Sequence, residues 1–185
     1  MDPLKIILVG NSGCGKTTLF NCFLNKPDHK REKPTISPGC MKVDIQTEKG
    51  DILTVEIWDT AGQEQYYALS QMFYRDADVA LVCYTMDDKD SIQKWIDRVH
   101  QIVPNCIIIL TETKSDLLNY DQEYEEKTDG FDLKTKYQAM AHYLTSGYSG
   151  TNVTEVFVDS AKIFSIVHKK LNNTSLQQSQ KTPCC

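Results

Sequence analysis

A chain of 185 residues is long enough for one domain with a single sizeable core, and too short for two. Its 41% hydrophobic and 24% charged residues are typical of an ordinary globular protein and exclude a disordered or collagen-like chain. The formal net charge of −5, with lysines and arginines scattered along the chain, offers no basic face, so no nucleic-acid polymer is an expected partner.

The N-terminus lacks a signal-peptide pattern, and no apolar run approaches the roughly 20 residues that span a bilayer. Five of the seven cysteines are dispersed singly, without disulfide or metal-site spacing. We therefore expect a cytoplasmic protein in which these thiols are reduced.

The first half of the chain predicts a strand, a helix and a hairpin. Residues 4–9 are a short apolar run that indicates a buried strand, and residues 16–24 follow with a helical pattern. Residues 41–47 and 53–58 alternate apolar and polar side chains around a turn at residues 48–51. This hairpin is the only antiparallel pair we expect.

The second half alternates strands with helices. Buried strands are predicted at residues 79–84 and 107–110, separated by a helix whose apolar residues follow a cap at Asp90. A helix at residues 131–141, a brief strand at 142–145 and a long helix at 153–171 complete the order. The pattern predicts an α/β domain over residues 1–171, with a flexible tail at 172–185.

The most informative motif is GNSGCGKT at residues 10–17, which fits the phosphate-loop pattern between a predicted strand and a predicted helix. Backbone N–H groups of such a loop wrap phosphates, and the helix N-terminus adds a positive dipole. Lys16 is expected to reach the β- and γ-phosphates, and Thr17 to offer its hydroxyl to Mg²⁺. The predicted phosphate-binding residues are Ser12, Gly13, Cys14, Gly15, Lys16, Thr17 and Thr18. A simple glycine-rich turn is the alternative.

The string VEIWDTAGQE at residues 55–64 resembles the Ras superfamily of small GTPases. The resemblance implies a phosphate-loop NTPase fold: a six-stranded, mostly parallel sheet with one antiparallel edge strand and about five helices on both faces. It implies that Asp59 holds Mg²⁺ through water, that Gln63 orients the attacking water, and that Gly62 donates its N–H to the γ-phosphate. It further implies that Thr35 closes over Mg²⁺ only when GTP is bound. The expected metal residues are Thr17, Thr35 and Asp59; the expected catalytic residues are Lys16, Thr35 and Gln63.

A further motif, TKSD at residues 113–116, is positioned to read the base. The carboxylate of Asp116 can accept two hydrogen bonds from the guanine edge, and adenine lacks that pair of donors. Lys114 would lie along the base. Thr113 stands where the most familiar form of the motif has asparagine, and resembles the form found in Rho-type members.

The family's last element is a serine-alanine-lysine turn that faces the base. Residues 160–162 spell it, but they fall within the apolar pattern of the final helix, so we predict instead that Ser146 and Gly147 form this turn. Relatives also place an aromatic ring against guanine where this chain has Asp28, although His29 could partly substitute. We therefore predict weaker nucleotide affinity and faster GDP release than is usual in the family.

The final Cys184 and Cys185 resemble the double-cysteine ending of Rab proteins, which carries two geranylgeranyl groups. Two chains give stable anchoring, and residues 172–183 would serve as a flexible spacer. Two unmodified thiols are the alternative. The resemblance implies peripheral anchoring on the cytosolic face of endomembranes and a role in vesicle trafficking. Residues 36–41 nevertheless lack the usual Rab effector signature, which makes the chain a divergent member.

The expected activity is slow hydrolysis of GTP to GDP with Mg²⁺, as a two-state switch. The expected partners are effectors, an exchange factor, a prenyl chaperone and a GTPase-activating protein that supplies an arginine. The aromatic cluster at residues 66–74 would suit effector recognition, and the acidic segment 119–132 is expected to be a solvated surface. A non-hydrolysing guanine-nucleotide scaffold and an adenine-specific phosphate-loop enzyme remain as alternatives.

Overall fold

The computed structural model describes residues 3–26, 39–46, 50, 52–60, 72–118 and 126–179, with side chains in the last two helices described over residues 130–169. Six strands form one sheet in the order β2-β3-β1-β4-β5-β6. Their bounds are β1 (Leu4–Val9), β2 (Gly39–Gln46), β3 (Ile52–Asp59), β4 (Val79–Tyr84), β5 (Ile107–Glu112) and β6 (Ala141–Leu144).

The hairpin prediction is confirmed, because β2 pairs antiparallel with β3 at one edge of the sheet. The remaining pairs, β3 with β1, β1 with β4, β4 with β5 and β5 with β6, are all parallel. Parallel neighbours need crossover connections, and the helices between the strands supply them. The predicted fold class, a mostly parallel sheet with helices on both faces, is therefore confirmed.

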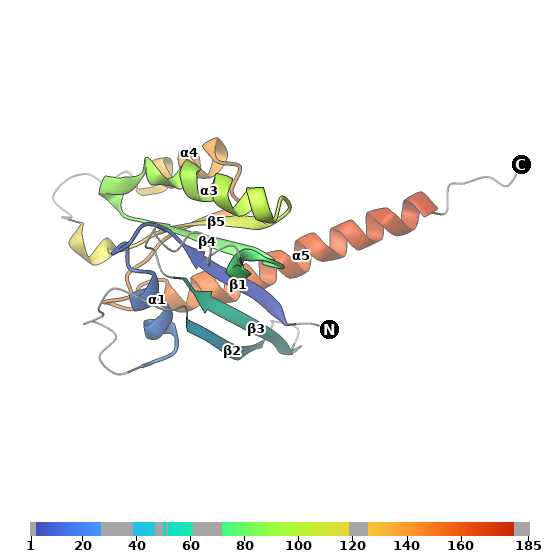
Figure 1. Cartoon of the computed structure of the whole chain (residues 1–185), viewed down its shortest axis with the longest axis horizontal. Coiled ribbons are helices and arrows are strands. Elements are labelled where there is room, and N and C mark those ends of the chain that lie inside the picture. The colour runs from blue at the N-terminus through green and yellow to red at the C-terminus, as the bar shows by residue number, and fades with distance from the viewer. Residues whose placement is uncertain are drawn as a thin grey trace, which may run out of the picture.

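Helices cover the sheet on two sides (Figure 1). They are α1 (Lys16–Phe23), α3 (Ser91–Ile102), α4 (Glu126–Lys136) and α5 (Val153–Ser179), with short 3-10 turns η2 (Met86–Asp88) and η3 (Ser115–Leu117). In Figure 1, α1 and α5 lie on one side of the sheet, α3 and α4 lie on the other, and α5 projects past the sheet. Among the described residues, no helix has both the length and the apolar character needed to cross a membrane.

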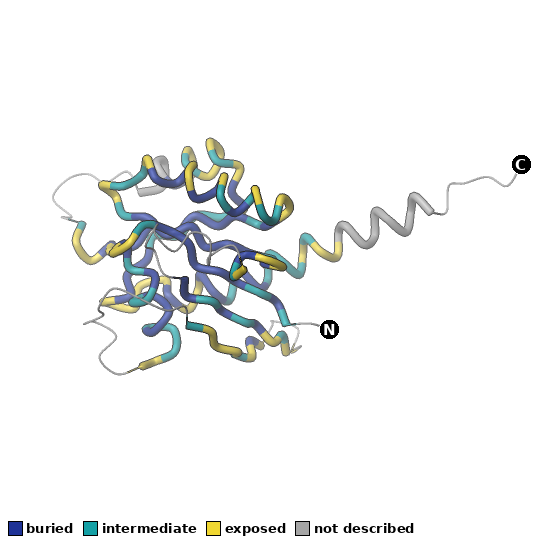
Figure 2. Tube along the Cα trace, viewed as in Figure 1, coloured by how far each residue is buried: buried dark blue, intermediate teal, exposed yellow. Residues whose placement is uncertain are grey.

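Two cores result, one on each face of the sheet. In β1, Ile6 and Leu8 pack into the core that α1 and α5 cover, whereas Ile7 and Val9 pack into the core that α3 covers. All six residues of β4 are buried, as a strand covered on both faces requires. Figure 2 shows these central strands as the buried layer of the molecule. They form the frame from which the loops at the strand ends extend.

Two predicted boundaries were wrong. α4 spans Glu126–Lys136 rather than 131–141, because residues after it form a turn in which Gln138 has a φ of 52° and the Met140 N–H already bonds to Ile108. α5 continues to Ser179 instead of ending at residue 171. Residues 172–179 contain no glycine or proline that would stop a helix, so this part of the expected flexible spacer is helical.

The predicted cap position at the start of α3 is confirmed, although its side chain does not cap the helix. Asp90 occupies the N-cap position but makes no side-chain capping hydrogen bond. The Ser91 hydroxyl instead donates to the Asp88 carbonyl at 2.8 Å, which links the start of α3 to η2.

Candidate functional site

The phosphate-loop motif lies between the end of β1 and the start of α1, as predicted. The Lys16 side chain folds back over the loop, and its ammonium group donates to the Gly10 carbonyl at 2.8 Å and the Asn11 carbonyl at 2.9 Å. Lys16 is only 4% exposed. A buried cation therefore lies against two backbone carbonyls of the loop, where it can neutralise a bound phosphate chain.

The other predicted phosphate-binding residues differ in their exposure. Ser12 and Gly13 are exposed at the tip of the loop, and Thr18 is half-buried on α1. Cys14 is buried, and burial raises the pKa of its thiol even though the nearby Lys16 acts in the opposite direction. The thiol is therefore neutral at physiological pH and adds no negative charge beside a phosphate.

A hydroxyl and a carboxylate meet where the loop joins α1. The Thr17 hydroxyl donates to an Asp59 carboxylate oxygen at 2.7 Å, and Asp59 is 2% exposed. These are hard oxygen donors of the kind that Mg²⁺ prefers, so the pair fits the predicted metal site. Within the described ranges, no group of three or more histidine, cysteine, aspartate and glutamate side chains could hold a metal. A cation here would thus depend on this pair, on water and on ligand phosphates.

Asp59 reaches this position because it ends β3. Leu8 of β1 pairs with Asp59 in register, and the Thr60 hydroxyl donates to the Leu8 carbonyl at 2.6 Å. Since β1 and β3 are parallel, their carboxyl ends meet at the same edge of the sheet, where ligands bind in this class of fold.

Several predicted residues lie outside the described residues. These are Asp28, His29, Thr35, Gly62, Gln63, Cys184 and Cys185. Their predicted roles stay predictions.

Thr113 ties the base-reading motif to the phosphate loop. Its hydroxyl lies 2.5 Å from the Cys14 carbonyl and 3.0 Å from the Tyr84 carbonyl, and its N–H donates to the Tyr84 carbonyl at 2.8 Å. Lys114 follows in the left-handed region with a φ of 61°. This threonine thereby joins three segments that are distant in the sequence.

The structure brings Asp116 and Ser146 together. The Ser146 hydroxyl donates to an Asp116 carboxylate oxygen and accepts the N–H groups of Tyr148 and Ser149, each at 3.1 Å. By contrast, Ser160 is buried in α5, where its hydroxyl bonds to the Val156 carbonyl at 2.5 Å. The turn at residues 146–147, and not residues 160–162, therefore lies beside the predicted base reader.

Gly147 allows this turn to approach α1 closely. A Cβ atom at residue 147 would lie 2.8 Å from the Thr18 carbonyl carbon and 2.9 Å from the Leu19 nitrogen, both backbone atoms that cannot move aside. From the sequence, Gly147 could be seen only as a replacement of the family's alanine. The structure gives a steric reason for glycine here, because a Cβ atom would clash with the backbone of α1.

Sequence reasoning missed Asn11. Its side-chain amide donates to Asp88 at 2.7 Å and accepts the Trp95 indole N–H at 2.9 Å. Asn11 thus connects the phosphate loop to η2 and α3. It stands at a freely variable position of the motif, so no sequence signal pointed to it.

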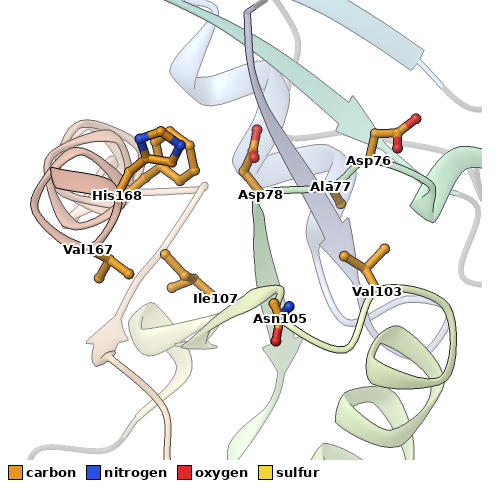
Figure 3. A pocket seen from close by; sticks show the side chains of 9 residues that line it. Asp76, Ala77, Asp78, Val103, Asn105, Ile107, Val167 and His168 are labelled. Carbon is orange, nitrogen blue, oxygen red and sulfur yellow. The ribbon is translucent and has the colours of Figure 1, made fainter. Parts of the chain in front are cut away.

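A pocket of about 380 Å³ lies elsewhere, where β4 and β5 begin and α5 leaves the sheet (Figure 3). Asp78, Ile107 and His168 are among its lining residues. Burial raises the pKa of Asp78, and its carboxylate accepts the Lys5 N–H at 2.8 Å. Because it lies at the amino ends of the strands, this pocket is separate from the phosphate loop.

Comparisons with known proteins agree with the geometry of the loops. The Ras family model matches residues 5–165. The chain is 32% identical to GTP-binding protein YPT53 of Saccharomyces cerevisiae over 83% of this chain and 73% of the relative. It is 27% identical to GTP-binding protein rho3 of Schizosaccharomyces pombe over 97% of this chain and 92% of the relative. It is 33% identical to GTP-binding protein RHO4 of Saccharomyces cerevisiae over 83% of this chain and 55% of the relative.

Proposed function

The chain belongs to the Ras family and is a small GTPase, and from this premise we propose that it hydrolyses GTP slowly and acts as a membrane-anchored switch in vesicle trafficking. The observation that carries the proposal is the pairing of a buried lysine at the phosphate loop with the Thr17–Asp59 contact at 2.7 Å. These groups supply charge neutralisation and metal binding, which are the main demands of phosphoryl transfer.

Each residue has a part in the proposed hydrolysis. Lys16 would neutralise the β- and γ-phosphates. Thr17 and Asp59 would hold Mg²⁺, which when bound would offset the charge that develops on the phosphate oxygens. Gln63 orients the attacking water, and Thr35 together with Gly62 responds to the γ-phosphate. Loss of that phosphate releases the segments around Thr35 and Gln63, which is the switch.

Guanine would be read at the other end of the site. Asp116 accepts the two donors of the guanine edge, and the Ser146 hydroxyl beside it orients the carboxylate. The Gly147 N–H would donate to the guanine oxygen. Thr113 links the base-reading motif to the phosphate loop through the Cys14 carbonyl.

Anchoring is proposed from the double cysteine at residues 184 and 185, and so is the Rab branch. Two isoprenoid chains would hold the protein stably on the cytosolic face of endomembranes. The direction of α5 supports this proposal, because the helix projects past the sheet away from the phosphate loop (Figure 1). A lipid anchor beyond it would leave the nucleotide site open to an exchange factor, a GTPase-activating protein and effectors, with a prenyl chaperone as a further partner.

The test of hydrolysis is single-turnover conversion of preloaded GTP with Mg²⁺, comparing the wild type with Gln63→Leu. We expect a rate on the order of 10⁻⁴ to 10⁻³ per second in the wild type and a collapse of that rate in the variant. Gln93→Leu is the matched control, since Gln93 is exposed on α3. Firmly held GTP that never converts, or equal rates in all three proteins, would favour the non-hydrolysing scaffold.

A further inference from the structure

Three titratable side chains meet in the interior directly beneath the base-reading loops. The Tyr84 hydroxyl lies 2.8 Å from Nε2 of His142 and 3.3 Å from a Glu112 carboxylate oxygen. The same carboxylate lies 3.5 Å from Nε2 of His142. Glu112 is 1% exposed and His142 is 13% exposed, while Tyr84 is fully buried. We call Tyr84, Glu112 and His142 the buried triad.

The buried triad comes from three adjacent strands. Tyr84 pairs with Glu112 in register at the ends of β4 and β5, and His142 lies on β6, the next strand. A carboxyl group in the interior is costly unless polar groups face it, so these side chains favour one spacing of the three strand ends.

The surroundings of the His142 ring are tightly packed. On α4, Gly130 faces the ring: a Cβ atom at this residue would lie 2.5 Å from the ring nitrogen Nδ1. Glycine has no side chain, so this described residue brings no charge to the ring. On β6 itself, the Tyr143 hydroxyl bonds instead to Asp159 of α5, at 2.9 Å. The described charged partner of His142 is therefore Glu112.

The backbone of the triad carries both base-reading loops. The Tyr84 carbonyl accepts the N–H and the hydroxyl of Thr113, at 2.8 and 3.0 Å. The Glu112 carbonyl accepts the N–H and the hydroxyl of Thr145, at 2.6 and 3.0 Å. Thr113 begins the loop that presents Asp116, and Thr145 precedes Ser146. A shift of either strand end would consequently move one base-reading group relative to the other.

We propose that the buried triad positions the two base-reading loops and thereby sets the rate at which guanine nucleotides leave. Its members are positioning residues, because they act through Thr113 and Thr145 and do not touch the nucleotide. The inference rests on the base-reading role proposed above for Asp116. It extends that role to three interior residues that the phosphate and metal chemistry does not use.

The experiment measures release of a fluorescent GDP analogue with Mg²⁺ from the full-length protein. His142→Leu removes both polar contacts of the ring, and we expect release to accelerate roughly tenfold. His142→Gln can place an amide nitrogen near the original Nε2, so it should restore a rate close to that of the wild type. If His142 only filled space in the core, Gln would not restore the release rate that Leu changes.

Tyr84→Phe is a second variant that keeps the ring volume and loses only the hydroxyl. It should also accelerate release. If His142→Leu fails to fold, this variant still tests the proposal. His100→Leu is the matched control, because His100 is half-buried on α3 and its Nε2 contacts the Cys106 carbonyl at 3.2 Å, remote from both loops. We expect unchanged release in this control.

A non-hydrolysable GTP analogue should leave the variants faster by the same factor, since the triad lies under the base and not under the γ-phosphate. Release from His142→Leu and Tyr84→Phe at the wild-type rate, in a protein that prefers GDP to ADP, would overturn this inference alone. A wild-type protein that holds GDP no better than ADP would overturn the base-reading role as well.

Discussion

Gly147 illustrates how one missing methyl group brings two elements together. The turn at residues 146–147 reaches the backbone of α1 at a distance that no Cβ atom tolerates. The preceding residue of the same turn, Ser146, bonds to Asp116, so the steric fit against α1 and the proposed base reading involve adjacent residues of one turn.

We predict that Gly147→Ala accelerates GDP release. The added Cβ would lie 2.8 Å from the Thr18 backbone, so the turn must move away from α1. Strain of about 1–3 kcal/mol is typical of such overpacking and corresponds to a change on the order of tenfold or more. Stopped-flow release of a fluorescent GDP analogue measures it.

The control for this change is Gly39→Ala on β2, where the added Cβ would lie 3.6 Å from the Phe20 ring, an ordinary contact. Its release rate should match that of the wild type. Equal rates in Gly147→Ala and Gly39→Ala would contradict the steric account.

At the scale of elements, the hydroxyl group of one threonine can hydrogen-bond a strand end to a loop. Thr113 connects β4, the phosphate loop and the base-reading loop through two carbonyls. Thr111, two residues earlier on β5, is also buried, but its hydroxyl has no hydrogen-bond partner. The two threonines therefore form a natural comparison.

We predict opposite outcomes for the same substitution at these positions. Thr113→Val leaves two carbonyls without the hydroxyl that bonds them, and we expect a loss of about 2 kcal/mol in the free energy of unfolding. Thr111→Val replaces an unbonded hydroxyl with a methyl group, and we expect it to be neutral or stabilising. Urea denaturation of both variants checks this, and similar losses at the two sites would contradict the assigned hydrogen bonds.

Elements with a strong local pattern could be predicted from the sequence, and elements held by tertiary contacts could not. The six strands and α1 follow from apolar runs, from the alternation of apolar and polar side chains in the hairpin, and from the phosphate-loop motif. The start of α4 lies in an acidic stretch with little apolar periodicity, and its end is determined by the pairing of β6 with β5. The same limit applies to the site, where the role of Asn11 depends on Trp95, a residue 84 positions away in the chain.

At the scale of the molecule, the sheet separates two ends with different tasks. The carboxyl ends of the strands carry the phosphate loop and the base-reading loops, whereas α5 leaves the molecule past the opposite edge (Figure 1). A switch protein on a membrane needs such a separation, because regulators must reach the nucleotide while the anchor stays in the bilayer.

The proposed anchor predicts that the protein moves from membranes to the soluble fraction when Cys184 or Cys185 is replaced by serine. One isoprenoid chain gives marginal, reversible binding, and two give stable anchoring, so each single variant should lose most of the membrane-bound fraction. Fractionation of eukaryotic cells that express each variant measures this, and mass spectrometry of the C-terminal peptide counts the attached groups.

Cys40→Ser is the matched control for the anchor, because Cys40 is an exposed cysteine elsewhere in the chain. Partial burial and the neighbouring Glu56 raise the pKa of its thiol to about 11, which keeps the thiol protonated and unreactive. Membrane association that survives replacement of both terminal cysteines would exclude the double-cysteine anchor and, with it, the main support for the Rab branch.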